Sequence, residues 1–137
     1  HRYVEEVGAM NIFFKIDGTV VTPPLGGSIL PGVVRDSALT LLADWGIPVE
    51  ERRISIDEVI AAFRSGALQE VFGAGTAAII CPVASIGFKG ELLNIITAPP
   101  GELTLRLYDE ITGIQYGKLE DRHGWNVRVT IPGSGMP

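Results

Sequence analysis

The sequence predicts a mixed α/β domain, because segments with strand character alternate along the chain with segments of helical periodicity. The chain has 137 residues, which is enough for one domain with a hydrophobic core. Hydrophobic residues make up 46% of the sequence and charged residues 20%, as is typical of a globular rather than a disordered protein. We therefore expect an α/β (α+β) fold in a single domain.

The first third of the chain predicts a β-hairpin followed by a helix. Residues 10–16 and 19–22 are apolar or β-branched, and Asp17-Gly18 between them is a hairpin turn signal. A loop rich in proline and glycine follows. Apolar residues then recur at three- and four-residue spacing, at Ala38, Leu41, Leu42 and Trp45. Gly46 and Pro48 end this predicted helix.

A strand is expected over residues 49–54, and a second helix is expected after it. Ser55, with Glu58 three residues later, has the spacing of a capping box. Gly66 is the expected end of the helix. Its predicted apolar face consists of Ile56, Val59, Ile60 and Phe63.

The rest of the chain predicts three more strands and a third helix. Residues 69–72 suggest a short strand, residues 78–83 a fully buried strand, and residues 91–96 a further strand. The third helix is expected after Gly101, with an apolar stripe of Leu103, Leu107, Ile111 and Ile114. Residues 130–137 are expected to form a flexible tail.

The composition argues against several classes of protein. A net charge of -5 disfavours a nucleic-acid binder, which would need clustered lysine and arginine. No apolar run approaches the roughly 20 residues of a membrane span. The single cysteine, Cys81, is expected to be buried, and His1 and His123 are too far apart to suggest a metal site. His123 is expected to be a structural or surface residue.

Two segments could bind an anion. In residues 30–35 the predicted helix begins after Pro31-Gly32, and the amides of Val33 and Val34 could point at a phosphate. The alternative is that this Pro-Gly pair is only a turn. In residues 73–77 glycines allow close approach of a ligand, and Thr76 adds a hydroxyl donor. The alternative for this second segment is a glycine bend within a sheet.

Taken together, three segments resemble the class IV pyridoxal-phosphate aminotransferases, in particular those specific for branched-chain amino acids. Residues 6–14 are similar to the family's Glu-x-Gly-x-x-Asn-x-Phe motif, and residues 22–25 and 29–37 to its phosphate-loop region. Residues 70–77 resemble its Gly-Thr-Ala segment, and residues 114–117 and 124–125 resemble its C-terminal end. The resemblance implies a D-amino acid aminotransferase-like domain, a mixed-sheet pseudo-barrel with flanking helices.

The resemblance also implies a site for pyridoxal 5'-phosphate. Glu6 would face the pyridine nitrogen, although from the residues alone a solvated surface charge is the usual case for such a carboxylate. Val33 and Val34 would bind the phosphate through their amides, and Thr76 through its hydroxyl. The amides of Ala77 and Ala78 would bind the carboxylate of the substrate.

The family's Schiff-base lysine and small N-terminal domain precede the segment that matches this chain, and the chain opens with His1 rather than Met. We therefore expect residues 1–129 to be the C-terminal part of a large cofactor-binding domain, completed by the remainder of the same polypeptide. The complete protein would transfer the amino group of leucine, isoleucine or valine to 2-oxoglutarate. It would act as a homodimer, and the chain alone would be inactive.

Other functions stay open from the sequence. A D-amino acid aminotransferase or an aminodeoxychorismate lyase would share the Glu-x-Gly and Gly-Thr-Ala motifs. A non-catalytic domain of the same fold is a further alternative. We expect small-molecule amino acid and 2-oxo acid partners, no nucleic acid and no membrane. A reducing, intracellular location is expected from the single cysteine, with the cytoplasm as the prediction and an organelle as the alternative.

Overall fold

The structure is a computed structural model, and it describes residues 3–4, 6–7, 10–26, 32–76, 79–88, 91–94 and 101–126. Glu6 and Val7 are described through their backbone only. Of the residues and segments predicted from the sequence, Ala77, Ala78 and the tail at 130–137 lie outside the described residues. None of the described helices is long and apolar enough to cross a membrane.

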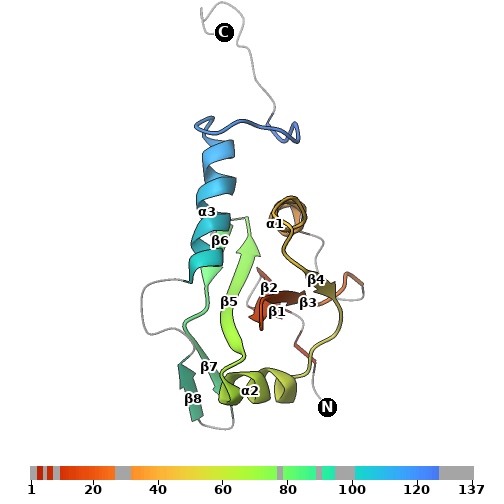
Figure 1. The fold of residues 1–137 in the computed structure, drawn as a ribbon, viewed down its shortest axis with the longest axis vertical. Coiled ribbons are helices and arrows are strands. Elements are labelled where there is room, and N and C mark those ends of the chain that lie inside the picture. Colours follow the sequence, from red (N-terminus) through yellow and green to blue (C-terminus); the bar gives the residue numbers. More distant parts are fainter. Residues whose placement is uncertain are drawn as a thin grey trace, which may run out of the picture.

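A mixed sheet forms the centre of the molecule (Figure 1). Its strands run in the order β4-β3-β2-β5-β6, and β1 also pairs with β2. The β3–β4 pair is parallel and the other pairs are antiparallel. The bounds are β1 Glu6–Val7, β2 Met10–Ile16, β3 Thr19–Thr22, β4 Val49–Glu51, β5 Leu68–Gly75 and β6 Ile79–Pro82. A separate hairpin joins β7 (Ser85–Phe88) to β8 (Glu91–Asn94).

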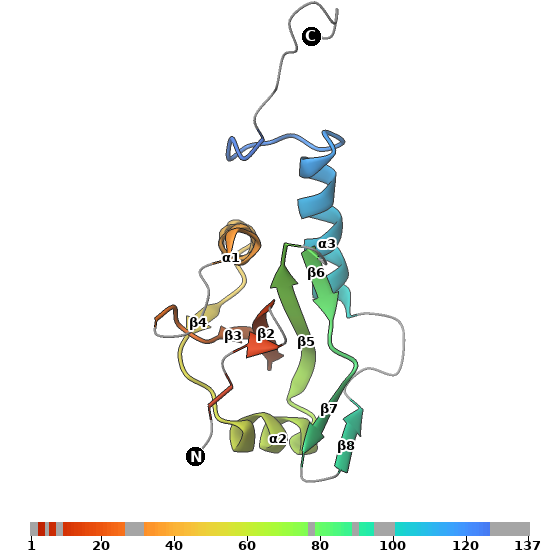
Figure 2. The same ribbon diagram turned by 180° about the vertical axis from the view of Figure 1, so that it is seen from behind.

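Helices cover both faces of this sheet. In the described residues these are α1 (Val33–Asp44), α2 (Ile56–Ser65) and α3 (Glu102–Gln115). Helices α1 and α3 lie near one end of β5, and α2 lies near the other end, as both views show (Figures 1 and 2). This arrangement agrees with the mixed α/β fold that the sequence predicts.

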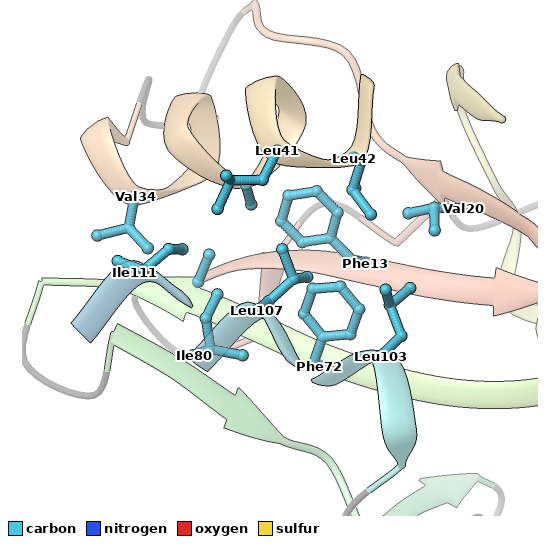
Figure 3. Close-up of a cluster of buried hydrophobic side chains, with 12 residues drawn as sticks. Phe13, Val20, Val34, Leu41, Leu42, Phe72, Ile80, Leu103, Leu107 and Ile111 are labelled. Carbon is cyan, nitrogen blue, oxygen red and sulfur yellow. The ribbon is translucent and has the colours of Figure 1, made fainter. Parts of the chain in front are cut away.

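The larger hydrophobic core lies between the sheet and the helices α1 and α3 (Figure 3). Phe13 of β2 and Phe72 of β5 stack at its centre, with ring centroids 5.0 Å apart. The other buried members are Val20, Val34, Ala38, Leu41, Leu42, Ala74, Ile80, Leu103, Leu107 and Ile111. The predicted apolar stripe of α3 is confirmed, since all four of its residues are buried.

The second core lies on the opposite face, beneath α2. Because side chains alternate along a strand, Ile12 and Phe14 of β2 point here while Phe13 points to the first core. Val20 and Val21 of β3 divide between the two cores in the same way. Burial on both faces explains why these strands read as continuous apolar runs.

Local signals in the sequence predicted the turns and helix ends well. Asp17 and Gly18 both have positive φ, 48° and 81°, as a two-residue hairpin turn requires. Gly66 ends α2 in the left-handed conformation. Ser55 caps α2, because its Oγ accepts a hydrogen bond from the Glu58 amide at 3.1 Å. The reciprocal half of the capping box is absent from the described contacts, where the Glu58 carboxylate binds Arg52.

Three predictions about strands need correction. Strand β5 extends to Gly75, so most of the predicted glycine loop belongs to the sheet. The β4 strand is shorter than predicted and ends at Glu51, and β7 was not predicted. The predicted buried strand at 78–83 is described as β6, which lies at the end of the sheet path and fully buries only Ile80. Cys81 on this strand is therefore half-buried, not buried as expected.

Candidate functional site

The three segments singled out in the sequence meet at the beginning of β2. Asn11 of β2 pairs with Glu6 of β1 on one side and with Ala74 of β5 on the other. The Asn11 side chain, only 5% exposed, lies against Gly32 at the start of α1. Asn11 thus links the Glu6 segment, the helix start and the end of β5.

Gly32 is required for this contact. A Cβ atom at Gly32 would lie 2.4 Å from Oδ1 of Asn11, which is closer than any side chain permits. The backbone of Gly32 is extended, with φ -71° and ψ 140°, as is usual for the residue that precedes a helix. The missing side chain therefore lets the first turn of α1 approach β2 closely.

The first turn of α1 is open to a ligand. Gly32 has no side chain that could accept a hydrogen bond from the first amides of the helix. Val33 is 82% exposed, while Val34 is buried in the first core. Helices α2 and α3 differ in the described residues, because Ser55 caps α2 and the Glu70 carboxylate caps α3. An anion at the start of α1 would meet the positive end of the helix dipole and first-turn amides that no side chain caps in the described contacts.

Arg35 lies in the same turn and is 4% exposed. Its Nη2 donates to the carbonyl oxygen of Pro23 at 3.1 Å and to Oε1 of Glu51 at 2.8 Å. Its Nε has no hydrogen-bond partner in the part of the chain that the structure describes. A buried donor without an acceptor is unusual and calls for an explanation in the function of the site.

Thr76 follows the last residue of β5 and is exposed. The preceding glycines make room for Met10, because a Cβ at Gly75 would lie 2.8 Å from Cγ of Met10 and a Cβ at Gly73 would lie 3.0 Å from its Cε. This close packing brings the end of β5, and with it Thr76, beside the beginning of β2. The alternative of glycines within a sheet is thus correct for residues 73–75, and Thr76 lies just beyond the strand.

A cavity of about 230 Å³ adjoins the first turn of α1. It is lined by Val33 and Val34, by the last turns of α3, and by Trp125 and Asn126. The segment at 121–126 is held in place by Asp121, whose carboxylate accepts hydrogen bonds from the amides of Asn126 at 2.7 Å and Trp125 at 2.9 Å. These amides lower the pKa of Asp121.

His123 has the structural role that the sequence predicts. Its Nε2 lies 2.8 Å from Oδ2 of Asp44 at the end of α1, and its ring stacks on Trp125. These contacts attach the segment to the end of α1, and the Asn126 side chain attaches it to α3, because its Nδ2 donates to the Ile114 carbonyl. No cluster of three or more histidine, cysteine, aspartate or glutamate side chains that could hold a metal ion occurs among the described residues.

Sequence reasoning named the three converging segments but missed Arg35 as a residue of interest. A signal was present, because Arg35 stands three residues before Ala38 and seven before Leu42, on the buried stripe of α1. A charge on an apolar stripe indicates a paired or functional residue.

Comparison with known proteins agrees with these features. A sequence model of the family described as "Amino-transferase class IV" matches residues 1–86. The chain is 53% identical over 128 residues to branched-chain-amino-acid aminotransferase 2 of Bacillus subtilis, a match that covers 93% of this chain and 35% of that protein. The chain thus spans about a third of the length of the curated relatives it matches.

Solved structures agree as well. The crystal structure of branched-chain amino acid aminotransferase from Escherichia coli aligns with a TM-score of 0.74 and 34% identity, over 90% of this chain and 37% of that one. An aminotransferase from Brucella abortus, bound to the cofactor PLP, aligns with a TM-score of 0.62 and 27% identity, over 80% of this chain and 35% of that one.

Proposed function

This chain belongs to the class IV aminotransferases, and we propose that it forms the cofactor-binding part of a branched-chain amino acid aminotransferase. The observation that carries the proposal is the convergence on Asn11 of three segments, namely β1 with Glu6, the open start of α1, and the end of β5. In this proposal residues 1–129 are the C-terminal part of the large domain. The remainder of the complete polypeptide supplies the small domain and the reactive lysine.

The described residues fit a phosphorylated cofactor such as pyridoxal 5'-phosphate. The first turn of α1 has open amides, Gly32 leaves its approach free of a side chain, and buried Arg35 adds a cation nearby. Backbone amides at a helix start are donors that phosphate groups prefer, and a buried guanidinium nearby adds positive potential that favours an anion. A class IV fold and a relative bound to PLP support the same cofactor.

When bound, pyridoxal phosphate supplies an electron sink that stabilises the negative charge left when an amino acid loses its α-proton. The amides of Val33 and Val34 and the hydroxyl of Thr76 would hold the phosphate. Glu6, whose backbone pairs with Asn11, would hold a proton on the pyridine nitrogen through its carboxylate. Ala77 and Ala78 would bind the substrate carboxylate through their amides, a role assigned from the family resemblance because both lie outside the described residues.

The proposal assigns the reactive lysine to the upstream part of the polypeptide. Of the lysines in this chain, Lys15 lies 3.6 Å from the Glu70 carboxylate, on the part of β2 remote from Asn11. We accordingly propose that the chain alone has no transaminase activity, that the complete protein is a homodimer, and that its substrates are small molecules, namely branched-chain amino acids and 2-oxo acids. The free thiol of Cys81 favours a reducing, cytoplasmic location.

The test is an assay of the complete protein with pyridoxal phosphate and 2-oxoglutarate. We expect amino transfer from L-leucine, L-isoleucine and L-valine and none from D-alanine. Residues 1–137 expressed alone serve as the matched control and should be inactive. Activity with D-alanine, or release of product from aminodeoxychorismate, would move the protein to another branch of class IV. A lysine-dependent rate from residues 1–137 alone would refute the proposed division of the site.

A further inference from the structure

The position of Arg35 is not explained by the stability of α1. A cation in the first turn faces the positive end of the helix dipole, which is unfavourable. Burying a guanidinium is also unfavourable unless its donors are paired, and Nε of Arg35 has no partner among the described residues. Since only 4% of Arg35 is exposed, it cannot be a solvated surface charge that happens to lie in this turn.

The contacts of Arg35 tie the helix start to the ends of two strands. Pro23, whose carbonyl accepts one hydrogen bond, directly follows β3, and Glu51, which accepts the other, is the last residue of β4. These strand ends lie side by side, because Thr22 pairs with Glu51 and the Thr22 carbonyl accepts from the Arg52 amide at 3.0 Å. The guanidinium of Arg35 therefore links α1 to the ends of both strands.

A second attachment holds the other side of the same turn. Gly32 lies against Asn11 of β2, so that the turn touches β2 as well as the ends of β3 and β4. These strands are themselves joined by the Thr22 hydroxyl, which donates to the Ile12 carbonyl at 2.7 Å. With attachments on two sides, the turn has little freedom to tilt relative to the sheet.

We propose that Arg35 is a positioning residue, which orients the amides of Val33 and Val34 toward the phosphate of the cofactor by clamping the helix start to Pro23 and Glu51. This inference rests on the proposed function, since it presumes a phosphate at the start of α1. Ligand-binding groups held by backbone must be placed to within about 0.5 Å, and α1 has no side-chain cap to fix its first turn. The buried charge of Arg35 also favours an anion at that end.

The experiment compares two ligands that differ only in the phosphate. Apo-forms of the complete protein and of its R35M, R35K and E51Q variants are titrated with pyridoxal phosphate and with pyridoxal by equilibrium dialysis. We expect R35M to raise the Kd for pyridoxal phosphate roughly tenfold or more while changing the Kd for pyridoxal less than about twofold. R35K should rescue part of the loss, because a lysine can reach one acceptor but lacks the planar fork.

The matched control is R52M. Arg52 is adjacent to Glu51 and pairs with Glu50 and Glu58, but its side chain is 39% exposed and does not contact α1 in the described structure. R52M should leave both dissociation constants unchanged. Thermal unfolding of every variant separates loss of fold from loss of positioning. If R35M does not fold, E51Q decides, because it weakens the ion pair with Arg35 at a side chain that is 51% exposed and should therefore still allow folding.

Each outcome has a distinct meaning. If the unaltered protein binds pyridoxal as tightly as pyridoxal phosphate, the phosphate site of the proposed function fails. If it prefers pyridoxal phosphate but R35M, R35K and E51Q retain that preference in full, the proposed function stands and the positioning role of Arg35 is refuted. A selective loss of phosphate affinity in folded R35M or E51Q, with R35K intermediate, supports the role.

Discussion

Helices α1 and α3 begin in nearly the same way, but their first turns have different neighbours. Both follow a glycine with extended backbone, Gly32 for α1 and Gly101 for α3. The first turn of α3 receives a carboxylate from within the protein, since Glu70 of β5 accepts hydrogen bonds from the Leu103 and Thr104 amides at 3.0 and 2.8 Å. The first turn of α1 receives no such group among the described residues.

The difference indicates which helix start is structural and which is available to a ligand. A helix N-terminus attracts an anion, and Glu70 supplies that anion permanently to α3. At α1 the nearby side chains are those of Asn11, which is neutral, of Arg35, which is cationic, and of Asp36, whose exposed carboxylate does not cap the helix in the described contacts. An external anion such as a phosphate would there take the place that Glu70 occupies at α3.

The largest expected effect comes from removing the internal anion. E70L should destabilise the protein by about 3 kcal/mol, because it leaves the amides of Leu103 and Thr104 without an acceptor. It also removes the acceptor of the Thr104 hydroxyl, which donates to Glu70 at 2.6 Å. E70Q keeps one acceptor oxygen and should lose about half as much. Urea unfolding of the complete protein measures both. A loss below about 1 kcal/mol for E70L would mean that α3 does not depend on this cap.

Adding a methyl group at each helix start sharpens the comparison. A Cβ at Gly101 would lie 2.2 Å from Cδ of Glu70, so G101A should destabilise the protein by about 2 kcal/mol. G32A would press on Oδ1 of Asn11, and we expect it to weaken binding of pyridoxal phosphate while G101A does not. For both variants, urea unfolding measures the stability and equilibrium dialysis measures the affinity for pyridoxal phosphate. Equal losses of cofactor affinity in both variants would contradict the assignment of α1 as the ligand-binding helix.

Helix α2 provides a smaller structural reference. S55A removes the hydroxyl that caps the Glu58 amide and should lower the free energy of unfolding by about 1 kcal/mol. Because α2 packs on the opposite face of the sheet from α1, cofactor affinity should not change. A change in affinity larger than that caused by G32A would show that the two faces are coupled.

The smallest effect concerns the segment beside the start of α1. Amides of Asn126 and Trp125 hold the pKa of Asp121 below its usual value. Because the pKa of the folded form is depressed, these hydrogen bonds stabilise the segment above the ordinary aspartate pKa, and the stabilisation is lost as the pH falls through the lowered pKa. An NMR titration of the Asp121 carboxyl should show a midpoint below that of a free aspartate. In the D121N variant, the NMR signal of Trp125 should no longer shift with pH.

Much of the fold could be predicted because its signals are local. The hairpin at Asp17-Gly18 depends on two residues with positive φ, and the ends of α2 depend on Ser55 and Gly66. The stripe of α3 needed only helical periodicity. Burial of strands was harder to predict, since the apolar run of β6 lies at the end of the sheet path and a sequence does not state which strands are central.

The sequence by itself determined the helices, the hairpin, the two segments that could bind an anion and the segment that carries the Glu6 carboxylate, because these depend on residue type and short-range spacing. Only the tertiary structure decided that the segments converge on Asn11, that Glu70 caps α3 across 33 residues of chain, and that Arg35 spans to Pro23 and Glu51. Which helix start keeps its amides available depends on strand order and register. Strand order and register arise from packing across the whole sheet, which no local stretch of sequence encodes.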